Sequence, residues 1–179
     1  MLDTIVQSAA PQAGSLVLDI GTGTGNVAER FMSLGCHVWG IDFSAEMLTQ
    51  AQVKLPEARF VQADILGVWP DELQRRFDRI AAAYVLHEFD LQTKVAFIQR
   101  LIQQHLAPKG WIVIGDIAFP TTYDREQARQ QWRNHWDDAE YYWAADEALA
   151  ALEYVGLQAE YIQVSWCAGV FVVPSPAQR

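Results

Sequence analysis

The stretch Val17-Leu18-Asp19-Ile20-Gly21-Thr22-Gly23-Thr24-Gly25-Asn26 decides the fold class of this chain. Its first four residues are typical of a buried strand, and its three alternate glycines predict a tight turn that leads into a helix. Because glycine has no Cβ, a ligand can approach the main chain of such a turn closely. The spacing is GxGxG, whereas a dinucleotide-binding turn is GxGxxG and would place glycine where Asn26 stands. We therefore expect a nucleoside-type ligand here, and the alternative is a turn without a ligand.

Short apolar runs alternate with segments of helical periodicity along the rest of the chain. We expect strands at residues 16–20, 36–41, 59–62, 77–85, 111–117, 157–164 and 167–173, and helices at residues 27–34, 45–55, 91–106 and 124–154, the last in one or two pieces. Five alternations predict an α/β fold, with an open, mostly parallel sheet and helices on both faces. The short junction at residues 165–166 predicts an antiparallel hairpin at the end. Ligands of such sheets bind beyond the carboxyl ends of the strands.

Two aspartates stand where neighbouring strands end. Asp42 follows the second strand, about 21 residues after Gly21, and can accept hydrogen bonds from both hydroxyls of a ribose. Asp64 follows the third strand, where its carboxylate can accept from the exocyclic amine of adenine while Ile65 packs on the ring. The alternatives are a surface cap for Asp42 and an ordinary turn residue for Asp64. The glycine turn upstream favours the ligand-binding roles.

Composition limits the classes of function. The chain has 179 residues, of which 51% are hydrophobic, and 13 Lys and Arg against 22 Asp and Glu give a formal charge of −9. This length fits one domain, residues 1–179, and the apolar content excludes a disordered chain. The lack of clustered basic residues disfavours duplex binding. No apolar run reaches the ~20 residues that cross a bilayer, and two distant cysteines give no disulfide framework. We expect a cytoplasmic protein without membrane or nucleic-acid partners.

Five blocks of the sequence resemble, in the same order, those of the class I S-adenosylmethionine-dependent methyltransferases. They are residues 18–25 (LDIGTGTG), 40–48 (GIDFSAEML), 62–64 (QAD), 77–88 (FDRIAAAYVLHE) and 106–111 (LAPKGW). The resemblance extends over residues 16–173. It implies a seven-stranded sheet of order 3-2-1-4-5-7-6 with strand 7 antiparallel. It also implies S-adenosylmethionine as the cofactor.

The resemblance implies roles for individual residues as well. Asp19 would face the amino end of the cofactor's methionine, and four residues of the turn would lie under methionine and ribose, namely Gly21, Thr22, Gly23 and Gly25. Asp42 would hold the ribose. Asp64 would contact N6 of the adenine, which three apolar side chains would enclose, namely Phe43, Met47 and Ile65. Ala83 and Tyr84 would border the methionine through main-chain atoms.

His87 is the candidate general base. Methyl transfer to oxygen or nitrogen can require removal of a proton, and this histidine is the one placed in a loop after a central strand. Tyr84 is a second candidate, for contact with the acceptor. The alternatives are a polar loop residue bonded to Glu88 or Asp90 in the case of His87, and ordinary packing in the case of Tyr84. We expect no metal site.

An aromatic segment lies at residues 130–143. Four of its residues fall at steps of four, three and four and would share one face of a helix, namely Trp132, Trp136, Ala139 and Trp143. Such a face could pack on the sheet edge, form a dimer contact, or line the pocket of the methyl acceptor. Nine acidic and three basic residues at positions 124–160 disfavour a large anionic acceptor.

Together these features favour an enzyme that methylates oxygen or nitrogen of a small molecule. The alternatives are an NAD(P)-binding oxidoreductase and a non-catalytic module that binds the cofactor. A homodimer is possible. Fifteen residues precede the first strand, so we expect a short N-terminal helix at residues 1–15 and a short or missing lid over the cofactor. We expect residues 174–179 to form a frayed tail.

Overall fold

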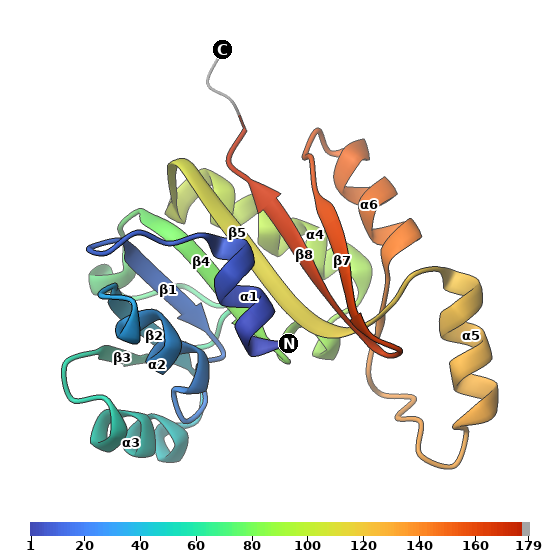
Figure 1. Cartoon of the computed structure of the whole chain (residues 1–179), viewed down its shortest axis with the longest axis horizontal. Helices are drawn as coiled ribbons and strands as arrows, with labels where there is room; N and C mark the ends of the chain where they lie inside the picture. Colours follow the sequence, from blue (N-terminus) through green and yellow to red (C-terminus); the bar gives the residue numbers. More distant parts are fainter. Residues whose placement is uncertain (177–179) are drawn as a thin grey trace.

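Helices cover both faces of a central sheet in the computed structural model, which describes residues 1–176 (Figure 1). The strands are β1 (Leu16–Ile20), β2 (His37–Asp42), β3 (Arg59–Gln62), β4 (Phe77–Ala83), β5 (Leu106–Phe119), β6 (Trp143–Ala144), β7 (Glu160–Ser165) and β8 (Ala168–Pro174). The α-helices are α1 (Leu2–Ala9), α2 (Asn26–Ser33), α3 (Ala45–Lys54), α4 (Leu91–Arg100), α5 (Thr122–Gln131) and α6 (Ala145–Tyr154). Short 3-10 turns span Asp71–Leu73 and Leu86–Glu88.

The strand order is β3-β2-β1-β4-β5-β8-β7. The first five strands of this order are parallel, and β8 runs antiparallel to both β5 and β7. The short strand β6 pairs with the end of β5 outside this order and was not expected. When β6 is set aside, the expected order 3-2-1-4-5-7-6 and the antiparallel final strand are confirmed, as is the α/β class.

Two apolar cores lie on opposite faces of the sheet. Val17 packs with Ile5 and Phe31 under α1 and α2, whereas its neighbour Leu18 packs with Ile98 under α4 and α6. This alternation follows from the twofold periodicity of a strand, which points successive side chains to opposite faces. Burial on both faces explains why the central strands are apolar almost throughout.

The ends of the chain lie against the central strands. Helix α1 falls within the residues where a short helix is expected and packs against β4 and β5. At the other end, Pro174 of β8 pairs with Trp111 of β5, and the Ser175 amide donates to the Gly110 carbonyl at 2.8 Å. These two residues of the expected frayed tail are therefore paired. Residues 177–179 of that tail lie outside the described residues.

The tryptophan-bearing helix is the main correction. The segment does form two helices, but α5 ends at Gln131 and the next helix begins at Ala145, so the four aligned positions do not share a helical face. Turns and irregular chain occupy residues 132–142, where the Asp137 carboxylate accepts from the Ala139 amide at 2.9 Å. Aspartate side chains that bond to nearby amides compete with helical hydrogen bonds, which explains the interruption. Trp143 lies in β6 instead.

The bounds of α4, β5 and β4 also differ from expectation. Helix α4 stops at Arg100 and continues as a π-helical turn, Leu101–His105, so Leu106 belongs to β5 and not to the helix. Strand β5 is longer than the expected 111–117, because it includes a turn at which Lys109 has φ 63°. Strand β4 ends at Ala83 and not at Val85, and the next residue, Tyr84, has φ 55°, which lies outside the extended region of a regular strand.

Candidate functional site

The glycine turn connects β1 to α2 at the carboxyl edge of the sheet. Gly21, Gly23 and Gly25 have φ of 63°, 53° and 82°, a region that residues with a Cβ rarely adopt. A Cβ on Gly21 would lie 2.7 Å from Cγ2 of Val85, so this position is also closed by packing. A Cβ on Gly23 would meet only the Met47 sulfur, at 3.5 Å. The main chain at Gly23 is therefore open to a ligand.

The buried side chain of Asp19 holds this turn through hydrogen bonds. The residue is 1% exposed, and its Oδ2 accepts from Thr22 Oγ1 at 2.7 Å and from the Ala28 amide at 3.1 Å. Burial raises the pKa of Asp19 to about 7, and the two hydrogen bonds oppose that rise. The residue therefore ties the turn to the first turn of α2, a role that sequence reasoning did not assign to Asp19 or Thr22.

Asp42 lies beside the turn, at the end of β2. Its Oδ2 accepts from the Gly23 amide and its Oδ1 from the Ser44 amide, both at 2.9 Å. Ser44 in turn caps α3, as its Oγ accepts from the Met47 amide at 3.3 Å. A carboxylate has about four acceptor positions, so two remain for hydroxyl donors. The structure thus brings Asp42 and the glycine turn together, as the sequence predicts.

The residues expected around adenine differ in accessibility. Phe43 and Met47 are 72% and 46% exposed, which leaves two apolar side chains uncovered near the turn. Asp64 is exposed, and its Oδ1 accepts from the Leu66 amide at 2.9 Å. Ile65 instead belongs to the core, and its carbonyl accepts from the Arg100 guanidinium. Little of the Ile65 side chain is left to cover a ligand.

The loop after β4 contacts the glycine turn. Ala83 pairs with Gly115, and the next amide, of Tyr84, donates to the Gly115 carbonyl at 2.9 Å. Tyr84 is half-exposed, and burial of the rest raises the pKa of its phenol. Its left-handed backbone costs roughly 1–2 kcal/mol, and strain of this kind gathers at functional sites. Val85 follows and packs on Gly21.

His87 is held by a buried carboxylate. Its Nδ1 lies 2.6 Å from Oδ1 of Asp116, and its amide donates to Oδ2 at 2.9 Å. Asp116 is fully buried and also accepts from Trp143 Nε1 at 3.2 Å. The hydrogen bond to Asp116 raises the pKa of His87 against the opposing effect of burial. With Nδ1–H donated to Asp116, Nε2 is the nitrogen that can take a proton.

The partner of His87 is therefore Asp116, not Glu88 or Asp90. Asp90 caps α4 instead, as its Oδ1 accepts from the Thr93 amide at 2.7 Å. Sequence reasoning missed Asp116, although one signal was present. It is the one charged residue within the expected strand at 111–117, and a charge buried in such a strand must have hydrogen-bond partners.

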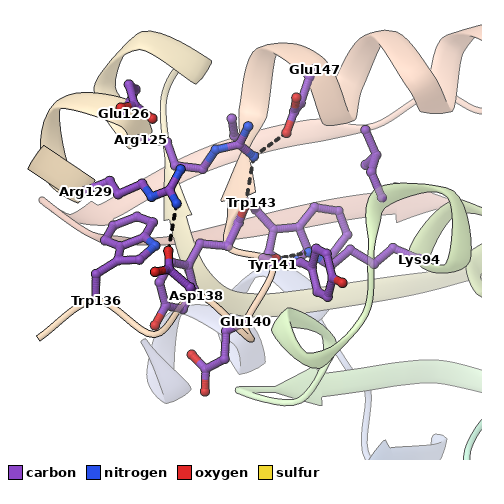
Figure 2. A pocket seen from close by; sticks show the side chains of 13 residues that line it. Lys94, Arg125, Glu126, Arg129, Trp136, Asp138, Glu140, Tyr141, Trp143 and Glu147 are labelled. Carbon is purple, nitrogen blue, oxygen red and sulfur yellow. Dashed lines mark hydrogen bonds and ion pairs between the residues drawn. The ribbon is translucent and has the colours of Figure 1, made fainter. Parts of the chain in front are cut away.

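A further pair of contacts joins the aromatic segment to this site. The Tyr141 amide donates to the His87 carbonyl at 2.6 Å. The Tyr141 carbonyl accepts from the ammonium of Lys94, as Figure 2 shows. Lys94 is 2% exposed and its Nζ lies 4.2 Å from the centre of the Trp143 ring. Burial lowers the pKa of Lys94 to about 8. Residues 141–143 are thus attached to both α4 and the His87 loop.

A cavity of about 360 Å³ opens beside this attachment. Its walls come from α4, α5, α6 and the segment between the last two helices, and they contain none of the residues of the glycine turn.

No helix within residues 1–176 combines the length and the apolar character that a membrane span requires.

Comparison with known proteins identifies the family. The family described as "Methyltransferase domain" matches residues 17–110, more than half of the chain. The chain belongs to the methyltransferase domain family. The resemblance noted on the five sequence blocks is thereby confirmed.

Relatives of this methyltransferase domain are identical to it at about a third of the aligned positions. An uncharacterized methyltransferase of Geobacillus kaustophilus is 35% identical over 130 residues, covering 72% of this chain and 57% of the relative. A dTDP-3-amino-3,4,6-trideoxy-alpha-D-glucopyranose N,N-dimethyltransferase of Streptomyces venezuelae is 32% identical over 124 residues, covering 66% of this chain and 49% of the relative. The chain spans a little more than half the length of the first curated relatives that it matches.

Solved structures share the fold of the methyltransferase domain. The magnesium protoporphyrin IX methyltransferase of Synechocystis PCC 6803, whose crystal structure contains bound SAH, superposes with a TM-score of 0.74 at 16% sequence identity. The match covers 97% of this chain and 81% of that one. At this identity the match describes the fold alone.

Proposed function

We propose that the chain is an S-adenosylmethionine-dependent methyltransferase that acts on oxygen or nitrogen of a small molecule. The observation that carries the proposal is the glycine turn, open at Gly23, with the Asp42 carboxylate bonded to it. The names of the relatives support the activity, and the SAH in a structural neighbour supports the cofactor. When bound, S-adenosylmethionine supplies a methyl group that is already activated by the positive charge on sulfur.

The residues present fit this cofactor. A Cβ at Gly23 would contact only the Met47 sulfur, so the main chain here is uncovered. A ligand could therefore approach the main-chain atoms of Gly23 closely. The free acceptor positions of Asp42 suit two ribose hydroxyls, and the exposed rings and chains of Phe43 and Met47 suit a flat base. The Asp64 carboxylate would accept from the amine of that base. Ile65 would contribute little, since it is buried in the core.

His87 is the proposed general base. Asp116 accepts from Nδ1–H and so fixes both the tautomer and the orientation of the imidazole. Nε2 can then receive the proton of an oxygen or nitrogen nucleophile. The hydrogen bond to Asp116 raises the pKa of His87, which makes the imidazole a better proton acceptor. Tyr84, half-exposed in the same loop, is the proposed acceptor contact.

Calorimetry with S-adenosylhomocysteine and with NADH tests the proposal. We expect S-adenosylhomocysteine to bind and NADH not to bind. Asp42→Ala should weaken S-adenosylhomocysteine binding by roughly 1–3 kcal/mol, because the ribose hydroxyls would lose their hydrogen-bond acceptor. The matched control is Asp71→Ala, an exposed aspartate in the 3-10 turn, which should leave affinity unchanged. NADH binding without a response to S-adenosylhomocysteine would instead support the oxidoreductase alternative.

A second assay separates the enzyme from a non-catalytic module. We expect His87→Ala to bind S-adenosylhomocysteine as the wild type does and to lose turnover by about 10²–10⁴-fold, the usual contribution of a general base. A panel of small alcohols, phenols and amines provides the acceptors. Cofactor binding with no methylated product from any of them would favour the non-catalytic module.

A further inference from the structure

The cavity beside residues 141–143 has the size of a small-molecule site and an unusual charge distribution. Its volume of about 360 Å³ lies in the range of pockets that enclose small ligands. Its walls carry three cationic side chains, Lys94, Arg125 and Arg129, and four carboxylates, Glu126, Asp138, Glu140 and Glu147. Which of these charges are already paired determines which ligand the cavity can accept.

All three cations have partners within the walls. Arg125 pairs with Glu147, and Arg129 pairs with Asp138 at 2.8 Å, as Figure 2 shows. The Lys94 ammonium is committed to the Tyr141 carbonyl and the Trp143 ring. Among the ion pairs within residues 1–176, none joins Glu126 or Glu140 to a lysine or arginine. The unbalanced charge of the cavity is therefore negative.

Aromatic rings stand next to one of these carboxylates. Trp136 and Tyr142 both line the cavity and meet edge to face, with ring centres 4.7 Å apart. Burial raises the pKa of Tyr142 to about 12, and the Glu140 carboxylate adds to this rise. Aromatic rings beside a carboxylate attract cations through both the ring quadrupole and the charge. An anion would meet repulsion from the same groups.

Glu140 also connects the cavity to the candidate base. Its Oε1 lies 3.7 Å from Nε2 of His87, the nitrogen that Asp116 leaves free. The side chain of Glu140 is 30% exposed and that of His87 12% exposed, so both are partly accessible. The loop that carries His87 contacts the glycine turn through Val85. A ligand in this cavity would thus lie beside the loop that also contacts the proposed cofactor site.

We infer that this cavity binds the methyl acceptor as a protonated primary or secondary amine, held by Glu140 and the rings of Trp136 and Tyr142, an inference that rests on the methyltransferase function proposed above. The ammonium must lose one proton before its nitrogen can act as a nucleophile. In that step an N–H bond breaks, the electron pair stays on the nitrogen, and the proton passes to Nε2 of His87. Glu140 stabilises the resulting imidazolium, as Asp116 does from the other side.

Three probes of similar shape test the charge preference without the cofactor. Benzylamine, benzyl alcohol and benzoate are cationic, neutral and anionic near neutral pH. They are titrated into nitrogen-15-labelled protein while the indole resonance of Trp136, assigned with Trp136→Phe, is followed. We expect benzylamine to shift this resonance and to bind about tenfold more tightly than benzyl alcohol, with benzoate weakest.

Glu140→Gln should reduce benzylamine affinity to that of benzyl alcohol. The matched control is Glu57→Gln, an exposed glutamate outside the cavity walls, which should bind all three probes as the wild type does. Equal binding of amine and alcohol, tighter binding of benzoate, or full amine affinity in Glu140→Gln would overturn the inference. S-adenosylhomocysteine calorimetry on the same proteins shows that the variant is folded. If that ligand fails to bind the wild type, the proposed function fails whatever the amine result.

Discussion

Three buried aspartates organise the candidate site at the scale of single residues. Asp19, Asp42 and Asp116 each lie at or near the carboxyl end of a central strand, and each carboxylate accepts from at least one main-chain amide. Buried carboxylates without such partners would be strongly destabilising. The hydrogen bonds of these aspartates fix three segments at the edge of the sheet. Asp19 holds the glycine turn, Asp42 holds that turn and the start of α3, and Asp116 holds the His87 loop.

The sequence predicts two of these three aspartates. Asp19 and Asp42 adjoin the glycine motif and could be found from spacing, although the bonds of Asp19 to Thr22 and Ala28 could not. Asp116 pairs with a histidine 29 positions away, so only the three-dimensional arrangement shows the pair. Ile65 shows the converse limit. It directly follows Asp64 and was expected to pack on adenine, but its burial in the core depends on packing that the sequence motif does not encode.

Asp116→Asn tests the pairing with His87. We expect the pKa of His87 to fall from above its ordinary value of 6.5 to that value or below, because the carboxylate is lost while burial remains. The midpoint of any pH–rate profile should fall with it, since a base works only when unprotonated, and the maximal rate should also fall. Nuclear magnetic resonance titration of the imidazole measures the change. An unaltered pKa would show that Asp116 does not control His87.

Asp19→Asn tests the buried carboxylate under the glycine turn. The folded pKa of about 7 exceeds the ordinary 3.8, so the stability that this group contributes is full below pH 3.8 and is lost as the pH rises through 7. The amide variant keeps an acceptor for Thr22 and Ala28 but cannot ionise. We expect it to gain stability relative to the wild type between these two pH values, by an amount on the order of 4 kcal/mol at most. Urea denaturation across this range measures the difference, and parallel pH profiles for the two proteins would contradict the account.

At the scale of elements, regular structure follows the sequence pattern and irregular structure does not. Strand β3 has the expected bounds, and Ser44 caps α3 near the expected start of that helix, because apolar periodicity and capping are local signals. The turns at residues 132–142 and the strand β6 depend on long-range contacts instead, such as the bond from Trp143 to Asp116. Many of the residues that line the candidate acceptor cavity lie in this irregular segment and in β6. The sequence therefore shows that the segment is aromatic, but not how its side chains are arranged.

Lys94→Met tests the attachment of this segment. The variant removes a hydrogen bond from a charged group, worth roughly 1.5–3 kcal/mol, while it keeps most of the apolar volume. We expect the Tyr141 amide, which bonds to the His87 carbonyl, to exchange with deuterium at least about tenfold faster. S-adenosylhomocysteine affinity should not change. Lys54→Met, at an exposed lysine of α3, is the control, and equal exchange in both variants would show that Lys94 does not hold the segment.

At the scale of the whole molecule, the chain's first helix is part of the central packing. Ile5 of α1 is fully buried, and a Cβ added to Gly115 of β5 would lie 2.5 Å from Ile5 Cδ1. Glycine at position 115 therefore allows α1 to approach the strand that carries Asp116. The contact between Ile5 and Gly115 therefore supports both the packing of the sheet and the position of Asp116 in the candidate site.

Ile5→Ala tests this coupling. We expect the free energy of unfolding to fall by about 2–5 kcal/mol, because the substitution leaves a cavity between α1 and the sheet. Ile162→Ala in β7, where the side chain is 39% exposed, should cost less than about 1 kcal/mol. Urea denaturation measures both. Equal losses would show that α1 contributes no more than an edge strand residue.

The central claim is that the glycine turn and Asp42 hold S-adenosylmethionine. The most direct measurement is a crystal structure of the chain with S-adenosylhomocysteine. We predict both ribose hydroxyls within hydrogen-bond distance of the Asp42 carboxylate and the methionine portion over Gly21 and Gly23. A ligand bound elsewhere, or a ribose with no contact to Asp42, would contradict the claim.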